Sequence, residues 1–114
     1  MARYTATFSI VNYGNHAHQT ACDLLKISGF RLLHESPDYV MGSEKPGAVK
    51  FSLLTTAEIL IDIPLDHSSL TLEMLVKNEE LPLKLNNHCK QVFDRLQHVF
   101  LESGEWNASL KASR

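Results

Sequence analysis

The chain has 114 residues, of which 44% are hydrophobic and 21% are charged. These values are typical of one soluble globular domain and exclude a disordered chain or a two-domain enzyme. A domain of this size has too little interior to enclose a large cofactor together with a substrate, so we expect no cofactor. The 11 Lys and Arg residues against 13 Asp and Glu residues give a net charge of -2, so we expect no nucleic-acid partner.

The sequence also indicates in which cellular compartment the protein resides. Its first residues contain no apolar run of signal-peptide length, and no run elsewhere approaches the ~20 residues that span a bilayer. We therefore expect a cytoplasmic protein with no membrane partner. Cys22 and Cys89 both fall within helical patterns, and in that compartment we expect two reduced structural thiols.

The first part of the chain predicts a strand, a helix and a hairpin. Apolar and polar residues alternate over residues 4–11, as they do in a half-buried strand. A helical repeat follows, for which Asn15 can serve as the N-cap and Gly29 as the left-handed residue that ends the helix. Residues 30–35 and 39–42 then predict two short strands joined by a turn.

The middle of the chain predicts further strands. Residues 49–65 alternate strongly, but their junction at 55–57 has no Gly, Asn or Pro. This stretch predicts either two strands or one long bent strand with a β-bulge. After a good turn sequence, residues 70–76 predict one more strand.

A long amphipathic helix is the clearest pattern in the sequence. We expect it to begin after Asn78, with Pro82 in its first turn, and to end at Gly104. Residues 105–114 predict a flexible tail unless Trp106 returns this segment to the fold. The apolar positions of the helix repeat at helical spacing and comprise Leu85, Cys89, Val92, Phe93, Leu96, Val99 and Phe100.

This order of elements predicts an α+β fold, written β-α-β(4-5)-α, in which two helices cover one face of a curved antiparallel sheet and the C-terminal helix is long. We expect a single domain over residues 1–104. The order is similar to that of small helix-grip domains and to the TATA-binding-protein-like arrangement of one curved sheet and two helices. The similarity is one of topology, because no functional motif of either group is present in the sequence.

His16 and His18 form the one local histidine cluster of the sequence. Side chains two residues apart on a helix diverge by about 200°, so this pair is poorly placed to share a metal ion, and we expect no metal site. Cys89 adjoins His88, but neighbouring helical side chains point about 100° apart and Cys89 lies on the apolar stripe. We therefore expect a core thiol at this position and assign no catalytic residue.

Carboxylates fall on the second face of the late strands, at Glu58, Asp62 and Glu73. A carboxylate pair there would suit acid–base chemistry or cation binding. The sequence predicts basic residues on the same face, namely Arg31, Lys50 and Lys77. Cross-strand ion pairs are therefore the simpler interpretation.

The same face also carries leucines, at Leu33, Leu54, Leu60 and Leu75. A solvated sheet face tends to be polar throughout, whereas a face that packs on a second copy of the chain carries apolar positions ringed by charges. We take Leu54, Leu60 and Leu75 as the candidate interface of a homodimer. The alternative is a bulge within residues 49–65 that exchanges the two faces and places some of these leucines in the core.

These patterns favour a small non-enzymatic binding module that acts as a homodimer or as an adaptor for another protein. The alternative is a carrier of a small apolar ligand, held in a helix-grip cavity. An enzyme that uses histidine or carboxylate chemistry ranks third, because these spacings assemble no nucleophile, base and orienting group. The expected lining of the carrier's cavity is Phe8, Phe51, Ile61, Leu72, Phe93 and Phe100.

Overall fold

The side chains of the first strand, β1 (Ala2–Val11), alternate between the core and the surface. Ala6, Phe8 and Ile10 are buried and the residues between them are partly exposed, which is the pattern of a strand covered on one face. The computed structural model describes residues 1–47, 49–81 and 83–114. The other elements, in chain order, are α1 (Ala17–Ile27), β2 (Phe30–Ser36), β3 (Tyr39–Glu44), the 3-10 helix η1 (Phe51–Leu53), β4 (Thr56–Asp62), β5 (Leu70–Asn78), α2 (His88–Glu102) and β6 (Asn107–Ser113).

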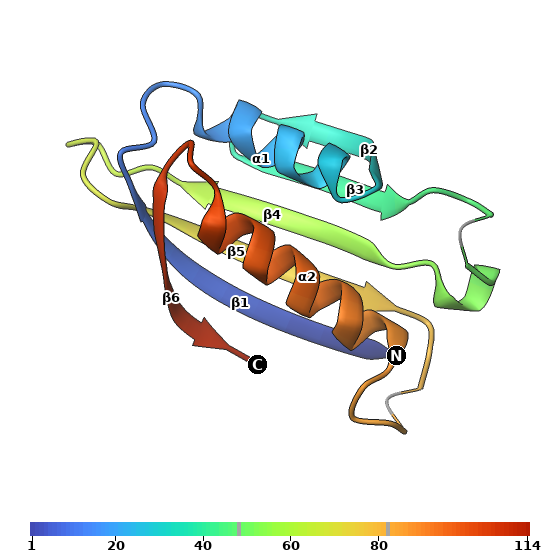
Figure 1. Ribbon diagram of the computed structural model, residues 1–114. Helices are drawn as coiled ribbons and strands as arrows, with labels where there is room; N and C mark the ends of the chain where they lie inside the picture. Colours follow the sequence, from blue (N-terminus) through green and yellow to red (C-terminus); the bar gives the residue numbers. More distant parts are fainter. Residues whose placement is uncertain (48, 82) are drawn as a thin grey trace.

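The strands form one six-stranded sheet in the order β2-β3-β4-β5-β1-β6. Every neighbouring pair is antiparallel. Strands β2 to β5 lie side by side in chain order, whereas β1 is inserted beside β5 and β6 pairs with the other edge of β1 (Figure 1). The structure therefore confirms the α+β class and the antiparallel sheet.

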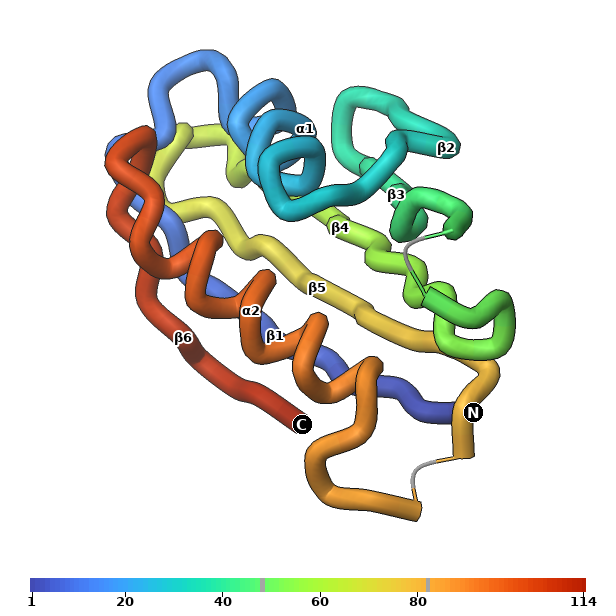
Figure 2. Tube along the Cα trace, turned by 45° about the vertical axis from the view of Figure 1, so that its right-hand side comes forward, coloured from blue at the N-terminus to red at the C-terminus, as the bar shows by residue number. Residues whose placement is uncertain are grey.

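Both helices lie on the same face of this sheet (Figures 1 and 2). Helix α1 packs on β2, β3 and β4, and helix α2 packs on β1, β5 and β6, so each helix covers one half of the sheet. The two helices also touch each other. We call the opposite side of the sheet, which faces away from both helices, the open face.

The core lies between the helices and the sheet. Val92, Phe93, Leu96 and Phe100 of α2 are fully buried, as the helical repeat predicts. The Phe8 ring stacks on the Phe100 ring with 6.3 Å between centroids. Such aromatic pairs add packing energy to the burial of apolar surface, and they join β1 firmly to α2.

Helix α2 begins later than the sequence predicts. It starts at His88 and has 15 residues, and Asn87 caps it by accepting a hydrogen bond from the Lys90 backbone N–H. Leu85, which we expected on the apolar stripe of this helix, is therefore in the preceding loop and is exposed. The expected place of Pro82 in the first helical turn lies outside the described residues.

Residues 49–65 contain one strand rather than the two strands or the single long strand that we expected. Residues 51–53 form η1, and β4 begins at Thr56. The reason lies in Glu44 at the end of β3, which is buried and binds both the backbone N–H and the backbone C=O of Thr55. The Glu44 side chain accepts from the Thr55 N–H, and the Glu44 N–H donates to the Thr55 carbonyl oxygen.

The segment 105–114, expected as a flexible tail, contains strand β6, which pairs with β1. Trp106 supplies the reason, because its side chain is buried and its indole N–H donates to the Phe100 carbonyl oxygen at 2.9 Å. Trp106 is thus anchored to the last turn of α2, and this contact directs the following residues onto the edge of the sheet.

The first helix departs from expectation only at its start. Its N-cap residue is His16, not Asn15, and the His16 side chain accepts no hydrogen bond from a helical N–H. Gly29 follows the helix with a φ of 89°, the left-handed conformation that the sequence predicts there. Within the described parts of the chain, no helix is long and apolar enough to cross a membrane.

Candidate functional site

The open face is built from the alternate residues of the central strands. In β4 and β5 the helix-facing residues are buried, and the residues between them form a regular grid on the other side. The strand register sets the rows of this grid: Arg3 and Lys77 are partners in one row, Thr5, Leu75 and Glu58 in the next, then Thr7, Glu73 and Leu60, and finally Ser9, Thr71 and Asp62.

Charge is distributed unevenly along this grid. The first row carries Arg3 and Lys77, whereas the two last rows carry Glu73 and Asp62. One end of the open face therefore carries two bases beside the carboxylate of Glu58, and we call it the basic end; the other end carries two carboxylates, and we call it the acidic end. Leu60 and Leu75 lie in the middle rows, and the Leu60 side chain is 50% exposed.

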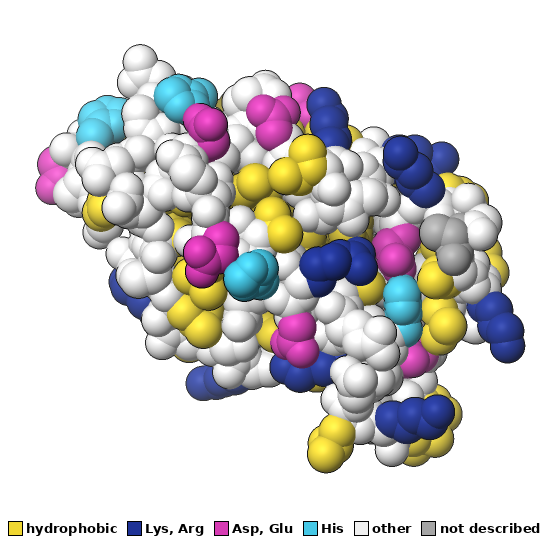
Figure 3. All heavy atoms as spheres, in the orientation of Figure 1, with side chains coloured by type: hydrophobic (Ala, Val, Ile, Leu, Met, Phe, Trp, Pro, Cys, Tyr) yellow, Lys and Arg dark blue, Asp and Glu magenta, His cyan; other side chains and the backbone are white. Residues whose placement is uncertain are grey.

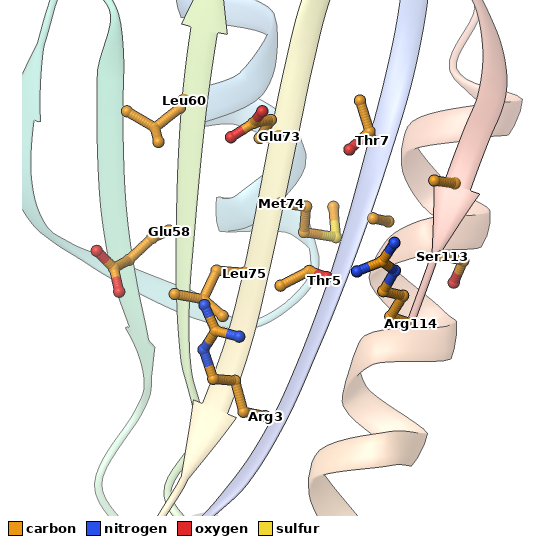
Figure 4. A pocket seen from close by; sticks show the side chains of 12 residues that line it. Arg3, Thr5, Thr7, Glu58, Leu60, Glu73, Met74, Leu75, Ser113 and Arg114 are labelled. Atoms are coloured by element: carbon orange, nitrogen blue, oxygen red, sulfur yellow. The ribbon is translucent and has the colours of Figure 1, made fainter.

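A depression of about 380 Å³ lies on the open face. It runs over β4, β5, β1 and the end of β6, and its lining includes Leu60, Leu75, Glu73 and the two arginines Arg3 and Arg114. Figure 4 shows the guanidinium groups of the two arginines on either side of Thr5. The depression combines apolar groups with charged groups of both signs. Such a lining suits the surface of a protein partner better than an apolar small molecule.

Glu58 is the best-anchored charge of the open face. Its carboxylate accepts a hydrogen bond from the Tyr39 hydroxyl at 2.7 Å and pairs with the Lys77 ammonium at 3.3 Å. The Tyr39 hydrogen bond and the nearby lysine lower the pKa of Glu58, and the same hydrogen bond raises the pKa of Tyr39 to about 12. The pair between Lys77 and Glu58 confirms the predicted cross-strand ion pairing for these two residues.

The three candidate interface leucines do not all reach the open face. Leu60 and Leu75 lie there on neighbouring strands, so the alternative in which they belong to the core is wrong. Leu54 precedes β4 and follows η1, where it is partly buried. It is therefore not part of the grid.

The residues expected to line an apolar cavity are mostly packed in the core. Phe51 is the exception, because it belongs to η1 and is 88% exposed. The other residues of that set, Phe8, Ile61, Leu72, Phe93 and Phe100, are buried. Neither of the two pockets described here is lined by any of them.

A second group of chemically active side chains lies on the helix side, between α1 and β2. The sulfur of Cys22 lies 3.8 Å from His18 Nε2 and 3.7 Å from Glu35 Oε2. One donor atom from each of the three side chains lies within 4.8 Å of the other two. His18 and Glu35 also line a pocket of about 570 Å³.

The Cys22 side chain is buried, with 2% of its residue surface exposed. Burial and the neighbouring Glu35 carboxylate raise the pKa of the Cys22 thiol to about 11. Without a cation this cysteine is therefore a neutral thiol at pH 7. The spacing of His18 to Cys22 is the signal in the sequence for this group, because Cys22, unlike His16, lies one helical turn from His18 on the same side of α1.

The polar residues around the start of α2 have a structural explanation. His88 Nε2 lies 2.8 Å from the Glu44 carboxylate, and Glu80 accepts the Cys89 backbone N–H at 2.8 Å. Burial acts to raise the pKa of Glu80, but hydrogen bonds from Asn78 and the helix N–H groups outweigh it and lower that pKa. These contacts satisfy the free N–H groups of the first helical turn.

Cys89 is fully buried beside this cluster, and burial together with the Glu80 and Glu44 carboxylates raises the pKa of its thiol to about 12. Both cysteines are free. The burial of Cys89 confirms its expected place in the core, and the raised pKa makes it a poor nucleophile.

The helix-bearing side of the molecule shows basic and acidic side chains interspersed over both helices (Figure 3). It lacks the segregation of charge that the strand register creates on the open face. Comparison of the chain with protein-family models, with curated proteins and with solved structures found no significant match.

Proposed function

We propose that this protein is a non-enzymatic binding module that forms a homodimer through the open face of its sheet. The observation that carries this proposal is the arrangement of the face, in which Leu60 and Leu75 lie between a basic end and an acidic end. Burial of exposed leucine surface contributes about 25 cal/mol per Å², and charge complementarity determines the orientation of the partner.

A second copy of the chain is the partner that this charge pattern suits. A two-fold axis that lies between two stacked sheets and crosses their strands reverses the strand direction of one copy. The basic end with Arg3 and Lys77 then faces the acidic end with Glu73 and Asp62, twice in one interface. An axis parallel to the strands would instead place like charges opposite each other.

The strand order also supports a more specific proposal for the type of α+β fold. Strands β2 to β5 with β1 beside β5, and two helices on one face, are the features that a helix-grip or TATA-binding-protein-like fold would have. Strand β6 is an addition to either arrangement. A fold of this kind does not by itself specify a function, so the dimer proposal depends on the open face alone.

Light scattering of the purified chain at increasing micromolar concentrations tests the proposal. We expect the mass of a dimer for the natural sequence and the mass of a monomer for the double variant Leu60→Lys with Leu75→Glu, because a closed interface would have to desolvate both charges. Leu85→Lys is the matched control, since Leu85 is 97% exposed and outside the open face. A monomeric natural chain at all concentrations would contradict the proposal.

Charge reversal tests the orientation of the two copies. Arg3→Glu and Glu73→Arg should each weaken dimerisation about tenfold, and the chain that carries both changes should recover most of the loss. Circular dichroism of each variant establishes that the fold is retained. If the combined variant is weaker than either single variant, the proposed antiparallel orientation is wrong.

A further inference from the structure

The group formed by His18, Cys22 and Glu35 lies on the helix side of the molecule, and its chemistry is independent of the proposed dimer. Three different donor types converge there from two elements, α1 and β2. Imidazole nitrogen, thiolate sulfur and carboxylate oxygen are all ligands of zinc in proteins. A thiolate and an imidazole together favour zinc over magnesium and calcium, which prefer oxygen donors.

The two distances from the Cys22 sulfur are close to those of a tetrahedral zinc site, and the donor atoms of His18 and Glu35 lie within 4.8 Å of each other. With bond lengths of about 2.3 Å to sulfur and about 2.0–2.1 Å to nitrogen and oxygen, neighbouring ligand atoms lie about 3.5 Å apart. The sulfur of Cys22 lies 3.8 Å from His18 Nε2 and 3.7 Å from Glu35 Oε2. Nδ1 of His18 lies 4.0 Å from the same sulfur, so both ring nitrogens lie near it.

The local structure explains why these side chains meet. His18 and Cys22 are four residues apart on α1 and therefore lie one above the other on the same side of the helix. The register of β2 shifts between Leu32 and His34, and beyond this bulge Glu35 is paired with Val40, whose side chain is buried in the core. Glu35 is thereby turned to the helix side of the sheet, toward Cys22.

We propose that His18, Cys22 and Glu35 form a zinc-binding site with a fourth coordination position directed to the adjoining pocket. On binding, the Cys22 thiol gives its proton to water, and the thiolate and the carboxylate balance the two positive charges of the ion. The pocket of about 570 Å³, which His18 and Glu35 help to line, gives the fourth position room for water or a small Lewis base. Three protein ligands with an accessible fourth position are typical of zinc sites that exchange ligands.

Titration of the metal-stripped chain with zinc chloride in a calorimeter tests the site. We expect one zinc ion per chain, and a loss of affinity of about tenfold or more in each of the variants His18→Ala and Glu35→Gln. His16→Ala is the matched control, because His16 is an exposed histidine close in sequence that is not in the group, and it should bind zinc as the natural chain does. His18 and Glu35 are not buried, so both variants are expected to fold.

Cobalt reports which atoms bind. Co²⁺ in place of zinc should show the near-ultraviolet charge-transfer band of a cobalt–thiolate bond, and Cys22→Ser should remove it while Cys89→Ser retains it. Added azide should change the visible cobalt spectrum if the fourth position is accessible from the pocket.

Three results would overturn the inference. The first is the lack of zinc binding at micromolar concentrations. The second is an equal loss of zinc affinity in His16→Ala and His18→Ala, which would indicate that a surface histidine pair binds the ion. The third is a cobalt complex without a thiolate band. A cobalt spectrum that does not respond to azide would contradict the accessible fourth position. If Cys22→Ser does not fold, the comparison of His18→Ala with His16→Ala decides the matter.

Discussion

Two residues of the same predicted stripe, Phe93 and Leu85, differ completely in their surroundings. Phe93 is fully buried and stacks on Tyr4 with ring centroids 5.6 Å apart, whereas Leu85 is 97% exposed. We predict that Phe93→Ala lowers the free energy of unfolding by about 3–5 kcal/mol, because it removes buried apolar surface and leaves a cavity. Leu85→Ala should change it by less than about 0.5 kcal/mol.

Denaturant titration of both variants measures these losses. A loss below about 1 kcal/mol for Phe93→Ala would place this ring at the surface and contradict the register of α2. A large loss for Leu85→Ala would instead restore the longer helix that the apolar repeat predicts.

The hydrogen bond from Tyr39 to Glu58 makes a pH-dependent contribution to stability. Because the pKa of Glu58 is lowered in the folded state, its contribution is present above the ordinary glutamate pKa and is lost as the pH falls through the lowered value. The pKa of Tyr39 is raised to about 12, so the contribution of the neutral phenol is present below its ordinary pKa of about 10 and is lost as the pH rises to 12.

We predict that Tyr39→Phe lowers the free energy of unfolding by about 1 kcal/mol at neutral pH and raises the pKa of Glu58. The difference from the natural chain should shrink in acid and above pH ~10, since the ordinary tyrosine pKa is about 10. Urea titrations across pH and carbon NMR of the glutamate carboxyls measure the two effects. Tyr13→Phe is the matched control, because the Tyr13 hydroxyl donates to the Ser68 carbonyl oxygen, which does not titrate. The free energy of unfolding that this variant loses should therefore stay constant in acid.

At the scale of elements, strand β6 pairs with β1 but buries little side-chain surface of its own. Most of its residues are exposed, whereas Trp106 before it is buried and packs on Phe100 with ring centroids 6.0 Å apart. We predict that Trp106→Ala speeds amide hydrogen exchange in β6 far more than in β2 and β3, because it frees the strand from α2 without disturbing the distant hairpin.

The control for this prediction is Leu110→Ala, which changes an exposed residue within β6 itself. It should leave the exchange of the strand close to that of the natural chain. Equal acceleration of exchange in β6 and in the β2–β3 hairpin by Trp106→Ala would show that the tryptophan supports the whole fold and not one edge of the sheet.

The elements that the sequence predicted well are those whose period is set by the sheet or the core. The alternation of β1 and β5 and the helical repeat from Val92 to Phe100 all follow from burial on one side. The start of α2 could not be found in this way, because Leu85 lies four residues before Cys89, a helical spacing, although its side chain is exposed. There the Asn87 cap and the Glu80 hydrogen bond decide, and these polar contacts, three and nine residues apart, do not show in an apolar repeat.

At the scale of the whole molecule, the two sites differ in how far the sequence predicts them. Leu60 and Leu75 could be placed on one face because each alternates with buried neighbours. The spacing of His18 and Cys22 was readable on a single helix, but the approach of Glu35 depends on the bulge in β2. A bulge reverses the faces of a strand, and no turn residue in the sequence marks this one.

The deepest thiol reports on opening of the whole molecule. Cys89 lies in the first turn of α2 with no exposed surface, and its Sγ contacts the carbonyl oxygens of Ala2 and Val76 on β1 and β5. An aromatic disulfide reagent can therefore reach it only when α2 leaves the sheet, and the raised pKa of about 12 keeps the closed form unreactive at neutral pH.

We predict that labelling of Cys89, followed by peptide mass spectrometry, proceeds at a rate proportional to the population of unfolded chains. Phe93→Ala should then accelerate it by roughly a hundredfold or more, since every 1.4 kcal/mol changes an equilibrium tenfold. Leu85→Ala should leave the rate unchanged, because that side chain is exposed and loses no packing. Fast labelling that is insensitive to Phe93→Ala would mean that the start of α2 opens by itself. In that case the hydrogen bonds of Glu80 and Asn87, and not the aromatic core, would set the stability of this end of the molecule.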